Sequence, residues 1–278
     1  MNLALAQLEI GAGAVAANVD RGVDAVETAA DRGADLVVLP ELFNVGFFAF
    51  DAYADAAEPI DGPTHDRLAR AARTNDVAVL AGSLVEDLAA TRATTEVPVP
   101  ADTGLANTAV LYDRSGDRRL VYRKHHLWGY DSREADLLEP GDGLELADLD
   151  GFTVAATTCY DLRFPELYRT LSAAGADLFL VPSAWPYPRV EHWTTLSRAR
   201  AIENLAYVAT VNGAGTMGDT TLCGRSTVYD PWGTTVASSG DAPELVSADI
   251  DPDRVAEIRG EFPALDDRRT RDFYVRSP

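Results

Sequence analysis

Short apolar stretches alternate along the chain with longer amphipathic segments, and no other feature restricts the possible folds as strongly. Several apolar stretches are hydrophobic at nearly every position, which is typical of strands buried on both faces. They are 3–8, 35–39, 77–84, 107–112, 152–157, 177–181, 207–211 and 244–250. The Ala-rich segments between them have helical character, and they are 18–33, 64–75, 165–174 and 191–206. Alternation of this kind predicts an α/β fold.

Two long polar connections, 87–106 and 125–151, interrupt the alternation, and a charged tail, 259–278, follows it. Neither connection has the length or composition of a linker between domains, and no internal repeat is evident. A chain of 278 residues is compatible with one large domain. We therefore expect a single domain over residues 1–278.

The charge balance of the chain is strongly acidic. Asp and Glu number 44 against 24 Lys and Arg, which gives a formal net charge of −20. Such a surface repels phosphate, so nucleic acids and anionic membranes are excluded as partners. Hydrophobic residues make up 46% of the chain, too many for an acidic disordered protein. The acidity therefore predicts a solvated surface adapted to high salt.

The residues at the amino terminus and the number of cysteines indicate the cellular compartment of the protein. No apolar run approaches the roughly 18 residues that span a bilayer. A secretory signal begins with basic residues, whereas here Glu9 interrupts the first apolar stretch and the first basic residue is Arg21. Two cysteines, Cys159 and Cys223, do not form a disulfide framework in a chain this long. We expect a soluble cytoplasmic protein in which Cys223 is a buried thiol without a role.

Two of the apolar strands end in groups suited to acid–base or nucleophilic chemistry. Glu41 follows the strand in DLVVLPE, where partial burial raises the pKa of a carboxyl group and suits it to act as a base. Cys159 ends the strand in FTVAATTCYDLRFPE, and Pro165 begins a helix, as in an elbow that presents a nucleophile. An ordinary surface acid and a small buried thiol are the alternatives. Polar neighbours of the cysteine predict an exposed turn.

A third strand end carries the single lysine of the chain. Lys124 follows the short apolar strand in RLVYRKHHL, and all other basic residues are arginines. A lysine is ordinarily a solvated surface group. Arginine cannot replace a compact ammonium group at a tight site, so one retained lysine indicates a chemical constraint.

Glutamate, lysine and cysteine in this chain order resemble the nitrilase superfamily of carbon–nitrogen hydrolases. The resemblance rests on LVVLPELF, YRKHHL and CYDLRFPELYR, which contain the three residues. Further matching strings are SREADLLEPGD, VPSAWPYPR, RARAIENLAYVATVNG and GRSTVYDPWG. Nearly the whole chain is covered, from LALAQ to EFPALDDR.

The resemblance implies a four-layer αββα sandwich and thiol hydrolysis of a small amide or nitrile, with no metal or other cofactor. By position, Glu41 is expected to be the general base, Cys159 the nucleophile and Lys124 the cation that stabilises the oxyanion together with the backbone N–H of Tyr160. Glu134 matches a second glutamate that positions substrate or relays protons. Family members form dimers or larger homo-oligomers, and 165–206 and the tail are the candidate contact surfaces.

Within the superfamily, AWPYPR, HW and RARAIEN most resemble the omega-amidase group, which acts on ω-amides of dicarboxylates such as 2-oxoglutaramate. An arginine could then grip the distal carboxylate in bidentate fashion. The candidate pocket residues are Phe43, Tyr160, Arg163, Trp185 and Arg189. Structural salt bridges are the alternative role for the two arginines. NGAG at 212–215 departs from the arginine that many members carry after the asparagine.

Other activities remain open at this point. An N-carbamoyl amino acid amidohydrolase, an aliphatic amidase and a nitrilase would share the same residues. A dinucleotide-binding oxidoreductase is a remote alternative, because GAGAVA follows a strand, although the helix is expected near Asn18. A metal hydrolase built on His125 and His126 is disfavoured, because adjacent side chains point in different directions.

Overall fold

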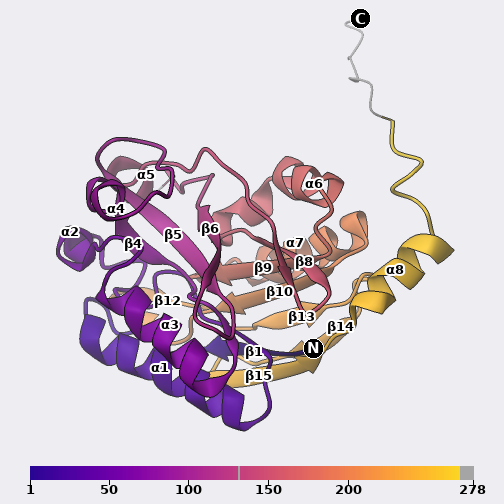
Figure 1. The fold of residues 1–278 in the computed structure, drawn as a ribbon, viewed down its shortest axis with the longest axis horizontal. Coiled ribbons are helices and arrows are strands. Elements are labelled where there is room, and N and C mark those ends of the chain that lie inside the picture. The colour runs from indigo at the N-terminus through magenta and orange to yellow at the C-terminus, as the bar shows by residue number, and fades with distance from the viewer. Residues whose placement is uncertain (131, 270–278) are drawn as a thin grey trace, which may run out of the picture.

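The computed structural model describes residues 1–130 and 132–269 and contains two large β-sheets (Figure 1). The first sheet has the strand order β15-β1-β2-β3-β5-β4, and β6 also pairs with β5. Its strands are β1 (Asn2–Gln7), β2 (Leu36–Val38), β3 (Ala78–Leu80), β4 (Leu84–Asp87), β5 (Leu105–Tyr112), β6 (Arg118–Arg123) and β15 (Glu244–Asp249). The central strands β1, β2 and β3 are parallel, and the flanking strands are antiparallel.

The second sheet has the strand order β14-β13-β10-β9-β8-β7. Its strands are β7 (Ala147–Leu149), β8 (Phe152–Ala156), β9 (Leu178–Ser183), β10 (Tyr207–Asn212), β13 (Thr227–Tyr229) and β14 (Thr235–Ser238). Here too a parallel centre, β8, β9 and β10, has antiparallel edges. A short hairpin, β11 (Thr216–Met217) and β12 (Thr220–Thr221), stands apart.

Helices cover the outer faces of both sheets, as Figure 1 shows. The first sheet is covered by α1 (Val15–Asp31) and α3 (Pro63–Asn75), and the second by α6 (Pro165–Ala173) and α7 (Val190–Asn204). The shorter helices are α2 (Tyr53–Ala56), α4 (Leu88–Thr94) and α5 (Glu134–Leu137), and α8 (Pro252–Glu261) follows the last strand. Two single turns of 3₁₀-helix, Phe50–Ala52 and Cys159–Arg163, complete the elements.

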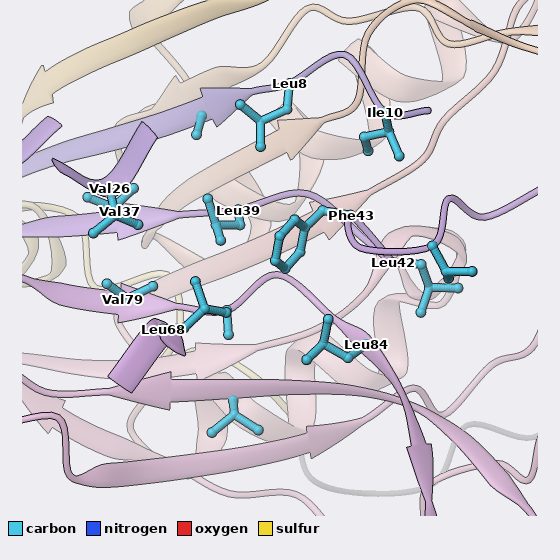
Figure 2. Packing of buried hydrophobic residues seen from close by; sticks show 14 of the residues in the cluster. Leu8, Ile10, Val26, Val37, Leu39, Leu42, Phe43, Leu68, Val79 and Leu84 are labelled. Carbon is cyan, nitrogen blue, oxygen red and sulfur yellow. The ribbon is translucent and has the colours of Figure 1, made fainter. Parts of the chain in front are cut away.

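The alternation of side chains along each strand builds the layers. On β1, Leu3 and Leu5 point between the two sheets and pack in one core with Leu180 of β9. Ala4 points the opposite way, into a second core beneath the helices. In Figure 2, Val26 of α1, Leu68 of α3, Val37 of β2 and Val79 of β3 lie together in that second core. The predicted αββα sandwich is thereby confirmed.

Several local expectations were wrong. The stretch 77–84 is divided between β3 and the start of β4, and the expected loop 87–106 begins with α4, which Asp87 caps by accepting the N–H of Ala90. α1 begins at Val15 rather than near Asn18. The charged tail does not begin at residue 259, because α8 continues to Glu261; residues 270–278 lie outside the described residues.

Across residues 1–130 and 132–269, no helix has both the length and the apolar character required to cross a membrane. This agrees with the hydropathy pattern of the sequence.

Candidate active site

The three strand ends singled out in the sequence meet in one place. Glu41 follows β2, Lys124 follows β6, and Cys159 follows β8. Gly82 packs tightly against the turn before Glu41. Gly82 has a φ of +52°, and a Cβ atom on it would lie 2.0 Å from the carbonyl oxygen of Pro40. Only glycine fits such an approach. The backbone of Lys124 is held in register because its N–H donates to the carbonyl of Asn107 on β5 over 2.9 Å.

Lys124 lies between two carboxylates that no solvent reaches. Its ammonium Nζ is 2.8 Å from Glu41 Oε1, 2.8 Å from Glu134 Oε1 and 2.9 Å from Glu134 Oε2. The side chain of Asn107 joins the two acids, since its Nδ2 donates to Glu41 Oε1 over 2.9 Å and to Glu134 Oε1 over 3.1 Å. The backbone N–H of Trp128 donates to the other Glu134 oxygen over 2.8 Å. The three hydrogen bonds that the Lys124 ammonium can donate are therefore all made.

Electrostatics keep the lysine protonated. Burial by itself lowers the pKa of Lys124, but the nearby charges of Glu134 and Glu41 raise it above the ordinary value. Its ammonium also lies 5.1 Å from the centre of the Phe47 ring, within cation–π range. The Lys124 ammonium group is therefore a permanent positive charge within the site.

Glu41 has the properties of a buried base. Burial raises its pKa above 4.5, and Lys124 opposes that shift. Its Oε1 is bound to Lys124 and Asn107, while Oε2 accepts the backbone N–H of Ala184 over 2.9 Å. After burial, the charge of this carboxylate is the strongest influence that raises the pKa of the nearby Cys159 thiol. The carboxylate is thus placed to take a proton from sulfur.

Cys159 lies on a strained turn between β8 and α6. Its φ of +47° falls in the left-handed region, which is unfavourable for a side chain larger than glycine. The expected exposed turn was wrong, because Cys159 is 8% exposed. Burial, then the charge of Glu41, raises the pKa of the thiol, although Lys124 opposes them. Burial and the charge of Glu41 therefore both favour the protonated form of the thiol.

The turn that holds Cys159 is clamped from the outer helix layer. Arg200 of α7 is buried, and its Nε and Nη2 donate to the carbonyl of Leu162 over 3.1 and 2.6 Å. The same guanidinium forms a salt bridge to Glu203 over 2.7 Å. This contact gives the RARAIEN string a structural role: it fixes the end of the 3₁₀ turn that begins at the cysteine.

A narrow pocket leads from the surface to Cys159. Its walls carry four of the five pocket residues expected from the sequence and two of the expected catalytic residues: Tyr160, Arg163, Trp185, Arg189, Lys124 and Cys159. The wall residues that were not expected are Phe47, Trp128, Ala184 and Pro186. Phe43 does not line the pocket. Its ring is fully buried in the core beneath α1, where it fills the space next to Gly22 (Figure 2). Phe47, four residues later, occupies the pocket wall instead.

Both predicted arginines lie at this pocket and rest on aromatic rings. The guanidinium of Arg163 is 4.9 Å from the centre of the Trp185 ring and 5.5 Å from that of Tyr160. That of Arg189 is 5.4 Å from the Trp128 ring. Within the described part of the chain, neither arginine forms a salt bridge with a carboxylate, and the Arg163 guanidinium lies 3.4 Å from His192 Nδ1.

Asn107, Phe47 and the N–H of Ala184 were missed by sequence reasoning. Asn107 is the one of these with a usable signal, because an amide side chain interrupts the apolar stretch of β5. Phe47 lies in an aromatic-rich segment where several rings are equally plausible. The role of Ala184 depends on its backbone, which a residue type does not reveal.

The structure also bears on the two other site types considered from the sequence. α1 begins directly after the glycine-rich segment, but Glu41 is buried against Lys124 and is not free to bind a ribose. His126 Nδ1 lies 2.7 Å from Asp161, whereas the ring of His125 stacks on Tyr122. The adjacent histidines therefore face different neighbours.

Comparison with known proteins agrees with this geometry. The family model for carbon–nitrogen hydrolases matches residues 2–260. The chain is 37% identical to a 2-oxoglutaramate amidase of Paenarthrobacter nicotinovorans, covering 84% of this chain and 78% of that protein. It is 32% identical to the human omega-amidase NIT2, covering 98% and 96%.

A solved structure has the same fold over the whole chain. It is a CN-hydrolase superfamily protein of Xanthomonas campestris with an arsenic adduct in its active site, 31% identical, with a TM-score of 0.84 over 100% of this chain and 99% of that one. The chain therefore belongs to the carbon–nitrogen hydrolase family and is an enzyme that hydrolyses the C–N bond of a non-peptide amide.

Proposed function

We propose that Cys159 is the nucleophile of this hydrolase, Glu41 its general base and Lys124 the cation that stabilises the oxyanion. The observation that carries the proposal is the buried ion cluster, in which the Glu41 carboxylate binds the Lys124 ammonium group and its charge acts on the buried thiol of Cys159. Such a pairing allows a neutral thiol to be activated when substrate is bound. Glu134 takes the role of a positioning group, because both its oxygens bind Lys124.

The reaction that follows has two stages. Sγ of Cys159 attacks the amide carbon while Glu41 accepts the thiol proton, and the negative charge that develops on oxygen is stabilised by Lys124 and the backbone N–H of Tyr160. Glu41 passes its proton to the nitrogen, the C–N bond breaks, and ammonia leaves a thioester. Water, deprotonated by Glu41, attacks the thioester, and the acid departs as the thiol is restored.

We propose an amide that carries a second, anionic group as the substrate class, with the monoamide 2-oxoglutaramate as the leading candidate. Arg163 and Arg189 support this, because each is held on an aromatic ring without a carboxylate partner in the described ranges. Guanidinium groups bind carboxylates through paired charge-assisted hydrogen bonds. Relatives named 2-oxoglutaramate amidase and omega-amidase also support it.

We also propose a reducing, salt-rich cytoplasm and a homo-oligomeric state. The proposed nucleophile must remain a free thiol, which a reducing compartment favours. Exposed apolar side chains support self-association: Ile202 lies within the expected contact segment 165–206, Phe262 follows α8, and Trp232 is 5.7 Å from the Phe262 ring.

Replacement of each proposed catalytic group should remove turnover without unfolding the chain. We expect Cys159→Ala, Glu41→Gln and Lys124→Arg to lower kcat by at least about 10²–10³-fold, as loss of an oxyanion donor does. Glu41→Gln should fold well, because it leaves Lys124 paired with Glu134. The measurement is an ammonia-release assay with thermal unfolding of each variant.

The matched control is Cys223→Ala, which removes the other buried thiol and should retain wild-type turnover. Ammonia release at the wild-type rate by Cys159→Ala would refute the assignment of the nucleophile.

The acid limb of the pH profile of kcat/KM should lie above the ordinary pKa of a glutamate. Glu41 must be ionised to take the thiol proton, and burial raises its pKa above 4.5. We therefore expect kcat/KM to fall as the pH drops through a value above 4.5. The apparent pKa of this fall belongs to the interacting groups Glu41, Lys124 and Glu134 together. Initial rates in a constant-ionic-strength buffer series measure it. A limb at or below the ordinary glutamate value would contradict a buried base.

The arginines should affect anionic substrates selectively. We expect Arg163→Gln or Arg189→Gln to lower kcat/KM for 2-oxoglutaramate by roughly 10- to 100-fold, the value of a charge-assisted hydrogen bond. Activity on butyramide, a neutral amide, should change little. The comparison should include N-carbamoyl amino acids and nitriles. Equal wild-type activity on anionic and neutral amides would count against the proposed substrate class.

Salt should stabilise and activate the enzyme. A formal net charge of −20 repels itself in dilute buffer, and salt screens that repulsion. We expect turnover and the unfolding temperature to rise into the molar range of salt, with light scattering at each salt concentration to follow the oligomer. Full activity and folding in dilute buffer would rule out the salt adaptation.

A further inference from the structure

Asp161 is a buried carboxylate two residues beyond the proposed nucleophile, and it accepts four hydrogen bonds. Its Oδ1 accepts the backbone N–H of His126 over 3.0 Å and contacts the ring Nδ1 of the same residue at 2.7 Å. Its Oδ2 accepts the hydroxyl of Tyr122 over 2.6 Å and the backbone N–H of Thr158 over 2.9 Å. Its side chain is fully buried.

The donors come from the two segments that carry the reacting groups. Tyr122 lies two residues before Lys124 and His126 two residues after it. Thr158 immediately precedes Cys159. One carboxylate therefore ties the chain on both sides of the lysine to the turn that presents the thiol, across the boundary between the two sheets.

The donor side chains are themselves held in place. The His126 ring stacks on Phe164 with ring centres 3.7 Å apart, and Tyr122 stacks on His125 at 6.1 Å. Asp161 also closes the turn that begins at Cys159, because its backbone N–H donates to the carbonyl of Thr158 over 3.0 Å. The contact is thus rigid at both ends.

We propose that Asp161 is a positioning residue that fixes the distance between the Lys124 ammonium and the Cys159 thiol. The proposal rests on the proposed catalytic roles of those two residues. Asp161 does not line the pocket, so it acts through its neighbours rather than on substrate. A carboxylate is required because all four partners approach it as donors, whereas an amide would present N–H groups to some of them.

The decisive variant is Asp161→Asn, which preserves shape but removes acceptor capacity. We expect kcat to fall about 10²-fold with little change in KM, because misplacement of reacting groups by about 1 Å has an effect of that size. Alkylation of Cys159 by iodoacetamide, followed by mass spectrometry, should slow about tenfold at fixed pH, equivalent to a rise of one unit in thiol pKa when the lysine moves away.

The matched control is Asp177→Asn. Asp177 accepts the backbone N–H of Thr153 over 2.8 Å at the opposite end of the same strand, β8, away from the pocket. It should lower stability without changing alkylation or kcat. Equal effects of the two variants on alkylation would show that Asp161 has only a structural role and would overturn the proposal.

A second route covers the case in which Asp161→Asn does not fold. Tyr122→Phe with His126→Leu removes both side-chain donors from the lysine side and leaves the carboxylate in place. A fall in both kcat and the alkylation rate supports the proposal, and wild-type values for a folded double variant overturn it. Because alkylation requires no substrate, this test gives an answer even if the wild-type enzyme does not hydrolyse the proposed amides.

Discussion

The buried contact of Lys124 with Glu41 and Glu134 is the interaction on which the rest of the site depends. An ammonium group and two carboxylates without solvent would be unstable singly, and they are tolerated together because Asn107 and two backbone N–H groups complete their hydrogen bonds. With both acids ionised, the three side chains carry a net charge of −1. Burial, and after it the charge of Glu41, raises the pKa of the thiol at the edge of the cluster, which favours the protonated form of the proposed nucleophile.

This arrangement requires the two sheets to meet at a fixed separation. Glu41 and Lys124 come from the first sheet, whereas Cys159 and Ala184 follow strands of the second. The apolar core between the sheets sets the distance, and Asp161 and Arg200 hold the turn that carries the cysteine. The left-handed backbone at Cys159 is unfavourable by itself, and it persists because its surroundings determine it from several sides.

How far the sequence could predict this site depends on how each residue acts. Glu41, Lys124 and Cys159 are visible because each follows an apolar strand and because the family motifs surround them. The α/β fold was also predictable, because the burial of strands and helix faces produces the alternation of apolar and amphipathic segments. The four-layer sandwich was predicted only from the resemblance to the nitrilase superfamily. Phe43 and Phe47 could not be separated, since both are aromatic and lie four residues apart. Both are buried, and only packing decides that Phe43 lies against Gly22 while Phe47 lines the pocket. α4 was hidden because its helix is short and polar, and its start depends on the cap by Asp87.

The acidic surface repels an anionic substrate, whereas the arginines of the pocket attract it. A formal net charge of −20 creates a field that repels carboxylates from the protein, which lowers their rate of encounter at low salt. Salt near 1 M shortens the screening length to about 3 Å, so that repulsion by distant surface acids vanishes. In the role proposed for them, Arg163 and Arg189 act at contact distance, where a shared pair of hydrogen bonds survives screening better than a long-range field does. A salt-rich medium therefore removes the long-range repulsion of an anionic substrate but leaves its proposed contacts with the pocket arginines. The acidic surface and an anionic substrate are then compatible.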